Sequence, residues 1–184
     1  MVRRLLAARL DVGLFARRAE VLDGFAALGA RACTSIAEAV SGAETIISCL
    51  FNERQVEEAL LGDGGLIEVA KPGAVLVSHT TIGPRLLSQV ERAAAARGLS
   101  LLDAPVSGAP DDIDAGHLTI LAGGEATTMR AMHAVGSLDE FARLGGAYLS
   151  KDVAAALSAA GEAGADAGLL ARIIHDGPLP VLGG

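Results

Sequence analysis

The chain has 184 residues, of which 51% are hydrophobic, and its formal net charge is -7. This length and hydrophobic content predict one main folded domain with a small additional part, because two full domains need a longer chain. The negative charge and the 3% aromatic content argue against a nucleic-acid-binding protein, which needs a basic surface and aromatic side chains that stack on bases. No apolar stretch is long enough to cross a bilayer, so no membrane partner is expected.

Helices and strands are predicted to alternate along the first half of the chain. Leu5, Leu6 and Leu10 give residues 1–10 the apolar side of a short helix, and residues 11–16 are the first predicted strand. The arginines of this region resemble those of a transit peptide, but the direct continuation into a strand favours a structural helix. Further strands are predicted at residues 31–35, 44–51, 74–81 and 99–105, and helices at residues 19–29, 36–43, 52–62 and 84–98. The alternation predicts an α/β fold with a Rossmann-like, doubly wound and mostly parallel sheet.

The later residues predict a different organisation. Residues 117–124 predict one more strand, and residues 126–136 and 150–164 predict helices. We therefore expect a main domain at residues 1–136 and a smaller helical part at residues 137–184. Cys33 and Cys49 lie in predicted strands without the spacing of metal ligands, which favours two buried thiols in a reducing compartment such as the cytoplasm.

Three of the predicted strands end in segments that suit ligand binding. In a doubly wound sheet, ligands bind at the carboxyl ends of the strands, near the point where the strand order reverses. Residues 50–52, 80–81 and 105–108 lie at such ends. The Ser107 hydroxyl and the amides of Gly108 and Ala109 can line a concavity that holds a carboxylate or a phosphate. An ordinary β turn explains these residues equally well when they are considered alone.

Two segments carry a family resemblance. DAPVSGAP (residues 103–110) and AGHLTILAGGE (residues 115–125) together resemble the substrate-binding signature of the 3-hydroxyisobutyrate dehydrogenase and 6-phosphogluconate dehydrogenase-like superfamily of 3-hydroxyacid dehydrogenases. Residues 1–18, 28–40 and 77–84 extend the resemblance over nearly the whole chain. It implies an NAD(P)-binding Rossmann domain, a small hydroxyacid or semialdehyde as the substrate, and a homo-oligomer as one option.

The resemblance also implies roles for individual residues. The carboxylate of the substrate would be held by Ser107, Gly108 and Ala109. Ala109 stands where the family often has a glycine, and its methyl group narrows the space through which the carboxylate approaches the amide. The contacts with the nicotinamide dinucleotide would come from Leu50, Phe51, Thr81 and Lys151.

The choice between the two nicotinamide cofactors depends on the end of the strand at residues 11–16. An acidic residue there accepts hydrogen bonds from a ribose hydroxyl, whereas an arginine pairs with a 2′-phosphate. Arg17 and Arg18 follow the strand, and no acid accompanies them. Arg17 therefore predicts NADP, with NAD as the alternative, unless the two arginines are only the solvated start of a helix.

Two features of the family are missing from this sequence. The family begins with a strand and a G-x-G-x-x-G turn that binds pyrophosphate, and the loss of that central strand would leave a gap in the sheet. The K-x-x-N pattern of the family's catalytic lysine is also absent, because Lys71 and Lys151 are the only lysines. Lys71 is expected to be solvated in a loop far from the strand ends. The catalytic residues are thus unknown.

The remaining candidates are weaker. His79 lies beside Thr80 and is the one spare acid-base candidate, although a structural histidine is the more common explanation. The histidines follow no pattern of metal ligands, and the acids of residues 111–114 are expected to be solvated in a polar loop, so no metal is expected. Two functions are left: an NADP-linked oxidoreductase of the 3-hydroxyacid dehydrogenase type, truncated and impaired, or a catalytically silent NAD(P)- or anion-binding remnant or interaction module.

Overall fold

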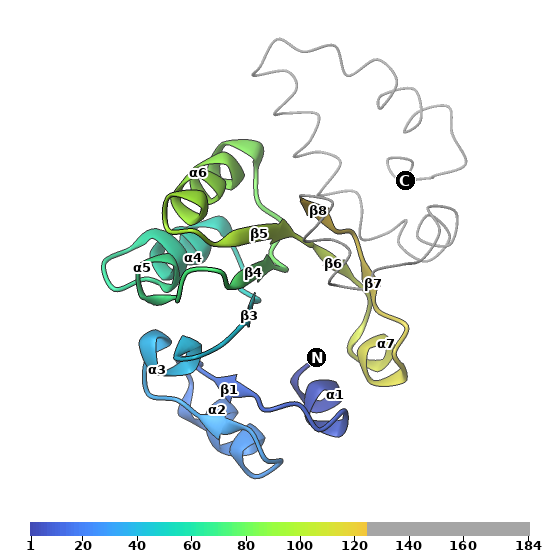
Figure 1. Cartoon of the computed structure of the whole chain (residues 1–184). Coiled ribbons are helices and arrows are strands. Elements are labelled where there is room, and N and C mark those ends of the chain that lie inside the picture. Colours follow the sequence, from blue (N-terminus) through green and yellow to red (C-terminus); the bar gives the residue numbers. More distant parts are fainter. Residues whose placement is uncertain (125–184) are drawn as a thin grey trace, which may run out of the picture.

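The structure is a computed structural model, and it describes residues 1–124 (Figure 1). The helices predicted at residues 126–136 and 150–164, the boundary between residues 136 and 137, and Lys151 lie outside the described residues. The expectations tested by the fold are therefore those for the main domain.

The first part of the chain forms a small parallel pair of strands with helices around it. Its elements are α1 (Val2–Ala7), β1 (Gly13–Leu14), α2 (Ala19–Ala26), β2 (Arg31–Ala32) and α3 (Ile36–Val40). β1 pairs with β2 in parallel, with Gly13 opposite Arg31. A helix between two parallel strands is the expected βαβ unit, so the predicted alternation is confirmed here.

The second part contains the larger sheet, in the order β3-β4-β5-β8. Its strands are β3 (Thr45–Ser48), β4 (Val75–Ser78), β5 (Ser100–Asp103) and β8 (Gly123–Gly124). The first three strands are parallel and in register, and β8 is antiparallel to β5. Together with the first part, this arrangement is the predicted Rossmann-like, mostly parallel α/β fold.

Helices connect the parallel strands and cover one face of the larger sheet. They are α4 (Glu53–Val56), the π-helix η1 (Glu57–Leu61), α5 (Leu66–Val69) and α6 (Pro84–Ala96). Proline at the first position of α6 fits the start of a helix, and Leu86, Val90 and Ala94 form its buried stripe. One helix was predicted at residues 52–62. The structure changes from α to π after Val56, and Val56 and Leu60 are both buried.

The main hydrophobic core lies between the larger sheet and these helices. Leu76 of β4, Val56 of α4 and Val90 of α6 are at its centre, each with no exposed surface. A smaller cluster of Val77, Leu102 and Ala104 lies apart from it. Residues 76 and 77 are neighbours on one strand and point to opposite faces, so the two clusters lie on the two sides of the sheet.

The predicted single strand at residues 117–124 is wrong. The structure divides it into β7 (Thr119–Ile120) and β8, which pair with different partners. β7 is antiparallel to β6 (Val106–Ser107), which follows β5 after Pro105. Because Pro105 has no amide hydrogen and restricts the backbone, the chain bends there, and one straight strand cannot pair with both β5 and β6.

Residues 1–124 contain an interruption of the sheet between β1 and β3. β1 pairs only with β2, and β3 is the first strand of the other sheet, so each has one edge without a strand partner among these residues. The gap expected from the family comparison is therefore present in the described part of the fold.

The two cysteines differ in their surroundings. Cys33 has no exposed surface, as predicted, whereas the prediction of a buried Cys49 is wrong, because this residue follows the last residue of β3 and is exposed. A search of the described helices for one long and apolar enough to cross a membrane finds none.

Candidate functional site

The loops after β3, β4 and β5 lie at one edge of the larger sheet. The three strands are parallel and in register, with Ser48 opposite Ser78 and Ser78 opposite Asp103. Their carboxyl ends therefore meet, and the loops that carry Leu50 and Thr81 start side by side. The structure thus brings together two of the regions that the sequence predicts for ligand binding.

A hydroxyl group ties these two loops to each other. The Thr80 Oγ1 accepts a hydrogen bond of 2.9 Å from the Leu50 amide and donates one of 3.0 Å to the Leu50 carbonyl. Thr80 is buried and Thr81 is half-buried beside it. Sequence analysis singled out Thr81 from the pair, and the structure shows that Thr80 positions the loop.

The start of α4 orients the neighbouring Phe51. The Asn52 side chain caps the helix by accepting a bond of 3.0 Å from the Gln55 amide, and the Gln55 side chain accepts one of 3.0 Å from the Phe51 amide. The Glu53 carboxylate also accepts a hydrogen bond from the Gly83 amide of the next loop. With its backbone fixed in this way, Phe51 leaves 89% of its surface exposed, an unusual exposure for a large apolar side chain.

His79 is buried at the end of β4 and is hydrogen-bonded to the next strand. Its Nδ1 lies 2.6 Å from the Ala104 carbonyl oxygen, and only 8% of the residue is exposed. A carbonyl can only accept, so we assign a hydrogen to Nδ1. The Ala104 amide also donates to the Ser78 carbonyl at 2.8 Å, so both backbone groups before Pro105 are held by β4.

A row of buried polar side chains lies just below this edge of the sheet. Ser48, Ser78 and Asp103 are register partners on three adjacent strands and therefore point to the same face. Ser48 Oγ, Ser78 Oγ and Asp103 Oδ1 are buried without a hydrogen-bond partner among the described residues. Burial raises the pKa of the Asp103 carboxyl above its ordinary value. Sequence analysis missed this row, although each of the three strands is an apolar run that ends in a polar residue.

The segment predicted to hold a substrate carboxylate follows β6. Ser107 is half-buried at the end of β6, and Gly108 has a φ of 148°, a backbone conformation that favours glycine. The Ala109 amide, which is predicted to line the concavity, donates a hydrogen bond of 2.7 Å to Asp112 Oδ2. The polar loop predicted at residues 111–114 is wrong, since these residues belong to the short helix α7 (Pro110–Ala115), but Asp111 and Asp114 are exposed as expected.

The charged candidates lie apart from these loops. Arg17 and Arg18 are exposed after β1, as expected for residues that are free to meet a phosphate. Lys71 is exposed just before β4, at the amino end of the sheet, and its Nζ donates to the Gly42 carbonyl at 2.8 Å. The prediction that Lys71 is remote from the strand ends is confirmed.

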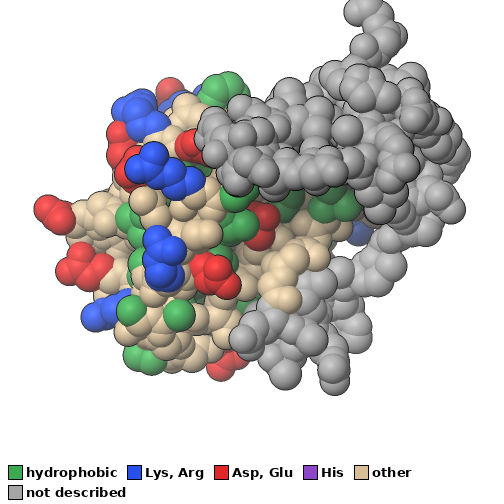
Figure 2. Space-filling view, turned by 90° about the horizontal axis from the view of Figure 1, so that it is seen from above, with side chains coloured by type: hydrophobic (Ala, Val, Ile, Leu, Met, Phe, Trp, Pro, Cys, Tyr) green, Lys and Arg blue, Asp and Glu red, His purple; other side chains and the backbone are tan. Residues whose placement is uncertain are grey.

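The described residues give no sign of a metal centre. No group of three or more His, Cys, Asp and Glu side chains in residues 1–124 could hold a metal ion. Acidic and basic side chains are interspersed on the described face in Figure 2. This edge of the sheet thus combines backbone amides, hydroxyl groups and apolar side chains with the titratable side chains of His79 and Asp103.

Comparison with known proteins gives a consistent result. Residues 1–146 match the family described as the NAD-binding domain of 6-phosphogluconate dehydrogenase. The chain is 38% identical over 129 residues to an NAD-dependent L-serine dehydrogenase of Pseudomonas aeruginosa, and these residues are 70% of the chain and 43% of that protein. It is also 38% identical over 126 residues to the 3-hydroxyisobutyrate dehydrogenase of the same organism, covering 68% of the chain and 42% of that enzyme. The chain thus spans less than half the length of these relatives.

A solved structure shows the same fold. The 3-hydroxyisobutyrate dehydrogenase of Mycobacterium tuberculosis, determined with L-serine, has a TM-score of 0.69 and 23% identity, and the alignment covers 99% of this chain and 68% of that one. At this identity the similarity supports the fold, while the family match over most of the chain establishes the relationship. The chain therefore belongs to the family of the 6-phosphogluconate dehydrogenase NAD-binding domain, whose members here include 3-hydroxyacid dehydrogenases.

Proposed function

We propose that the chain forms the dinucleotide-binding part of an NADP-linked oxidoreductase of the 3-hydroxyacid dehydrogenase type. The observation that carries the proposal is the convergence of the loops after β3, β4 and β5 at one edge of a parallel sheet. The relatives named after L-serine and 3-hydroxyisobutyrate support a small hydroxyacid or its semialdehyde as the substrate. The chain spans less than half the length of those proteins, so the reaction of a whole enzyme is part of what we propose and not something that the similarity establishes.

The described residues fit a dinucleotide at two places. Arg17 is exposed after β1, where a guanidinium group would pair with a 2′-phosphate, and this is the reason to propose NADP in place of NAD. Leu50, the exposed Phe51 and Thr81 would contact the nicotinamide end from the loops after β3 and β4. The bound dinucleotide would supply the hydride acceptor. Lys151 lies outside the described residues, and its contact with the cofactor stays a prediction.

The substrate end of the site is less complete. Ser107 and Gly108 would hold the carboxylate of a hydroxyacid, with Ala109 as the third member of the loop. Oxidation of a hydroxyl group also needs a base for its proton. Lys71, the lysine within residues 1–124, lies at the opposite edge of the sheet, and no described side chain is assigned as the base. This observation favours, as the second candidate, a catalytically silent NAD(P)- or anion-binding module or an interaction module.

The proposal also covers the cellular location and the binding partners of the protein. We expect a cytoplasmic protein that binds a small hydroxyacid, has no nucleic-acid or membrane partner, and has a homo-oligomer as one option. Size measurement in solution tests the last expectation.

Cofactor titration tests the proposal directly. We expect NADPH to bind about tenfold more tightly than NADH, the difference that one charge-assisted contact provides. Arg17→Ala should remove this preference by weakening NADPH binding alone. Arg92→Ala is the matched control, because Arg92 is an exposed arginine on α6 and removes the same charge elsewhere. Equal affinities of the original chain for NADPH and NADH would contradict the choice of NADP.

Hydride transfer separates the two candidate functions. The oxidoreductase proposal expects formation of NADPH from NADP when 3-hydroxyisobutyrate is added to the folded chain. Cofactor binding without any turnover for a series of small 3-hydroxyacids would support the silent module instead. Absence of both cofactor binding and turnover in a chain with a cooperative thermal transition would contradict the oxidoreductase and the NAD(P)-binding module, and would favour the anion-binding or interaction module.

A further inference from the structure

The Asp112 side chain occupies the loop that is proposed to hold the substrate. Its Oδ2 accepts a hydrogen bond of 2.7 Å from the Ala109 amide. The same oxygen lies 3.4 Å from the position that a Cβ on Gly108 would take. One carboxylate oxygen of the protein itself therefore lies against both Gly108 and Ala109, where the carboxylate of a hydroxyacid is proposed to bind.

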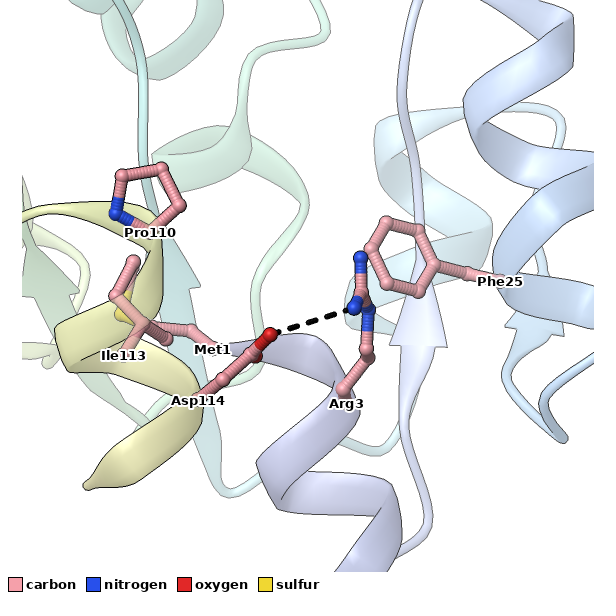
Figure 3. Close-up of a pocket in the computed structure, with 6 residues that line it drawn as sticks. All are labelled: Met1, Arg3, Phe25, Pro110, Ile113 and Asp114. Carbon is pink, nitrogen blue, oxygen red and sulfur yellow. Dashed lines mark hydrogen bonds and ion pairs between the residues drawn. The ribbon is translucent and has the colours of Figure 1, made fainter.

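The helix that carries Asp112 is held from its other side. Arg3 and Arg4 of α1 reach Asp114, with a distance of 3.4 Å from Arg3 Nη1 to Asp114 Oδ2 and a hydrogen bond of 3.0 Å from Arg4 Nη1 to the Asp114 carbonyl. Figure 3 shows the Asp114 side chain directed from α7 toward Arg3 of α1, and Pro110, Ile113 and Asp114 line a cavity of about 150 Å³ that Met1 and Arg3 of the N-terminal segment also line.

This arrangement determines where Asp112 points. Residues 110, 113 and 114 share one side of α7, and residue 112 lies on the opposite side. The contacts with α1 thus leave Asp112 facing the loop. Asp114 has basic neighbours, whereas no described cation is bonded to Asp112.

Two carboxylates cannot share this amide at low cost. A second carboxylate within hydrogen-bond distance of Ala109 would lie next to the Asp112 oxygen, and like charges at that distance repel each other. The amide has one hydrogen, so the two acceptors also compete for the same bond.

We propose that Asp112 is a specificity-determining residue that competes with the substrate carboxylate for the Ala109 amide. The inference rests on the proposed function, because it concerns the loop assigned to the substrate. A hydroxyacid binds fully only when Asp112 releases the amide, and a substrate without a carboxylate at this position binds with no such competition.

The test compares Asp112→Asn with Asp111→Asn in the whole chain. Both variants remove one negative charge from α7, but Asp111 is exposed and does not bond to the loop amide. The amide resonances of Gly108 and Ala109 are followed by NMR during titration with 3-hydroxyisobutyrate and with formate, a carboxylate probe that needs no further recognition. We expect Asp112→Asn to bind both carboxylates about tenfold more tightly than the original chain, and Asp111→Asn to bind them unchanged.

Each outcome decides the inference. Equal carboxylate affinity in the original chain and Asp112→Asn overturns it, as does an equal gain in Asp111→Asn, which would show a general effect of charge. Ala109 resonances that respond to neither carboxylate in any protein also overturn it. NADPH binding is measured on the same samples, and its loss in the original chain would count against the proposed function and not against the role of Asp112. An Asp112→Gly variant serves as the second test if the asparagine variant does not fold.

Discussion

Residues 1–35 and residues 44–104 are built from the same kinds of element, but they differ in what those elements bury. In the first region only Ala30 and Cys33 are buried, and neither α1 nor α2 contains a buried residue. In the second region, β4 and α6 contribute to a core whose central side chains have no exposed surface. A helix-strand-helix pattern therefore predicts local structure in both regions and a stable core in only one.

The difference in burial follows from the number of neighbouring strands and helices that each region packs against. β4 has strands on both edges, with β3 and β5 as its partners. β1 has one partner, and Val21, Leu22 and Phe25 on the helix of its βαβ unit are only half-buried. An apolar stripe stabilises a fold only when another surface covers it.

Large-to-small substitutions give the largest expected change in stability and test whether the two regions differ in packing. Leu76→Ala in the core should lower the free energy of unfolding by about 2–5 kcal/mol, because it removes buried methyl groups and leaves a cavity. Leu22→Ala in α2 should cost less than about 1 kcal/mol, because Leu22 is only half-buried. Urea denaturation of both variants measures the difference. Equal losses would show that the first region is as well packed as the second.

Two helix caps sharpen the border between the regions. The Ser35 side chain accepts a hydrogen bond of 3.1 Å from the Glu38 amide at the start of α3, and Asn52 caps α4 in the same way. Ser35→Ala and Asn52→Ala should each cost about 1 kcal/mol. We expect Ser35→Ala to affect global unfolding, because Val40 of α3 belongs to the main core. If its stability in urea is unchanged while Asn52→Ala is weakened, α3 unfolds with the first region.

The pH dependence of stability should show the smallest difference between the two regions. Two carboxyl groups should change the free energy of unfolding in opposite directions as the pH is varied. Hydrogen bonds from the Thr34 backbone and side chain lower the pKa of Glu38, whereas burial raises the pKa of Asp103. Glu38 therefore contributes stability that is present above its unfolded pKa of about 4.3 and is lost as the pH falls through the folded value. The neutral form of Asp103 is favoured in the fold, so its contribution is present below about pH 3.9 and is lost as the pH rises through the folded value.

Amide variants test these signs separately. Glu38→Gln should remove the loss of stability on acidification, and Asp103→Asn should remove the loss on raising the pH, as measured by thermal unfolding at a series of pH values. A stability curve for Asp103→Asn with the same slope as the original chain would show that the Asp103 carboxyl is not perturbed in the fold.

The sequence predicts the elements that depend on local pattern. β3, β4 and β5 are continuous apolar runs, and α6 has a proline at its first position and a clear buried stripe, so all four are where they were expected. The division of residues 117–124 into β7 and β8 was missed because it depends on how β6 turns away from β5. The polar row was missed for a similar reason, since Ser48, Ser78 and Asp103 become neighbours only through the register of three strands.

The candidate site shows the same limit. Sequence comparison suggested Leu50, Phe51 and Thr81 as contacts, and parallel pairing explains why the loops that carry them meet. The contact of Asp112 with the Ala109 amide was not expected, because the sequence predicts a polar loop at residues 111–114 and not a helix. Short helices of this kind depend on outside contacts, here those of Arg3 and Arg4, that a local pattern does not contain.

The thiol of Cys33 gives the molecule its own reporter of local opening. It is fully buried in the weakly packed first region, where Arg31 Nη1 lies 3.1 Å from its sulfur, while Cys49 is exposed beside the larger sheet. An alkylating reagent should therefore modify Cys49 in the native state and reach Cys33 only when the β1 and β2 strands separate. The rate of the second modification then measures how often this part of the fold opens while the core around Leu76 stays closed.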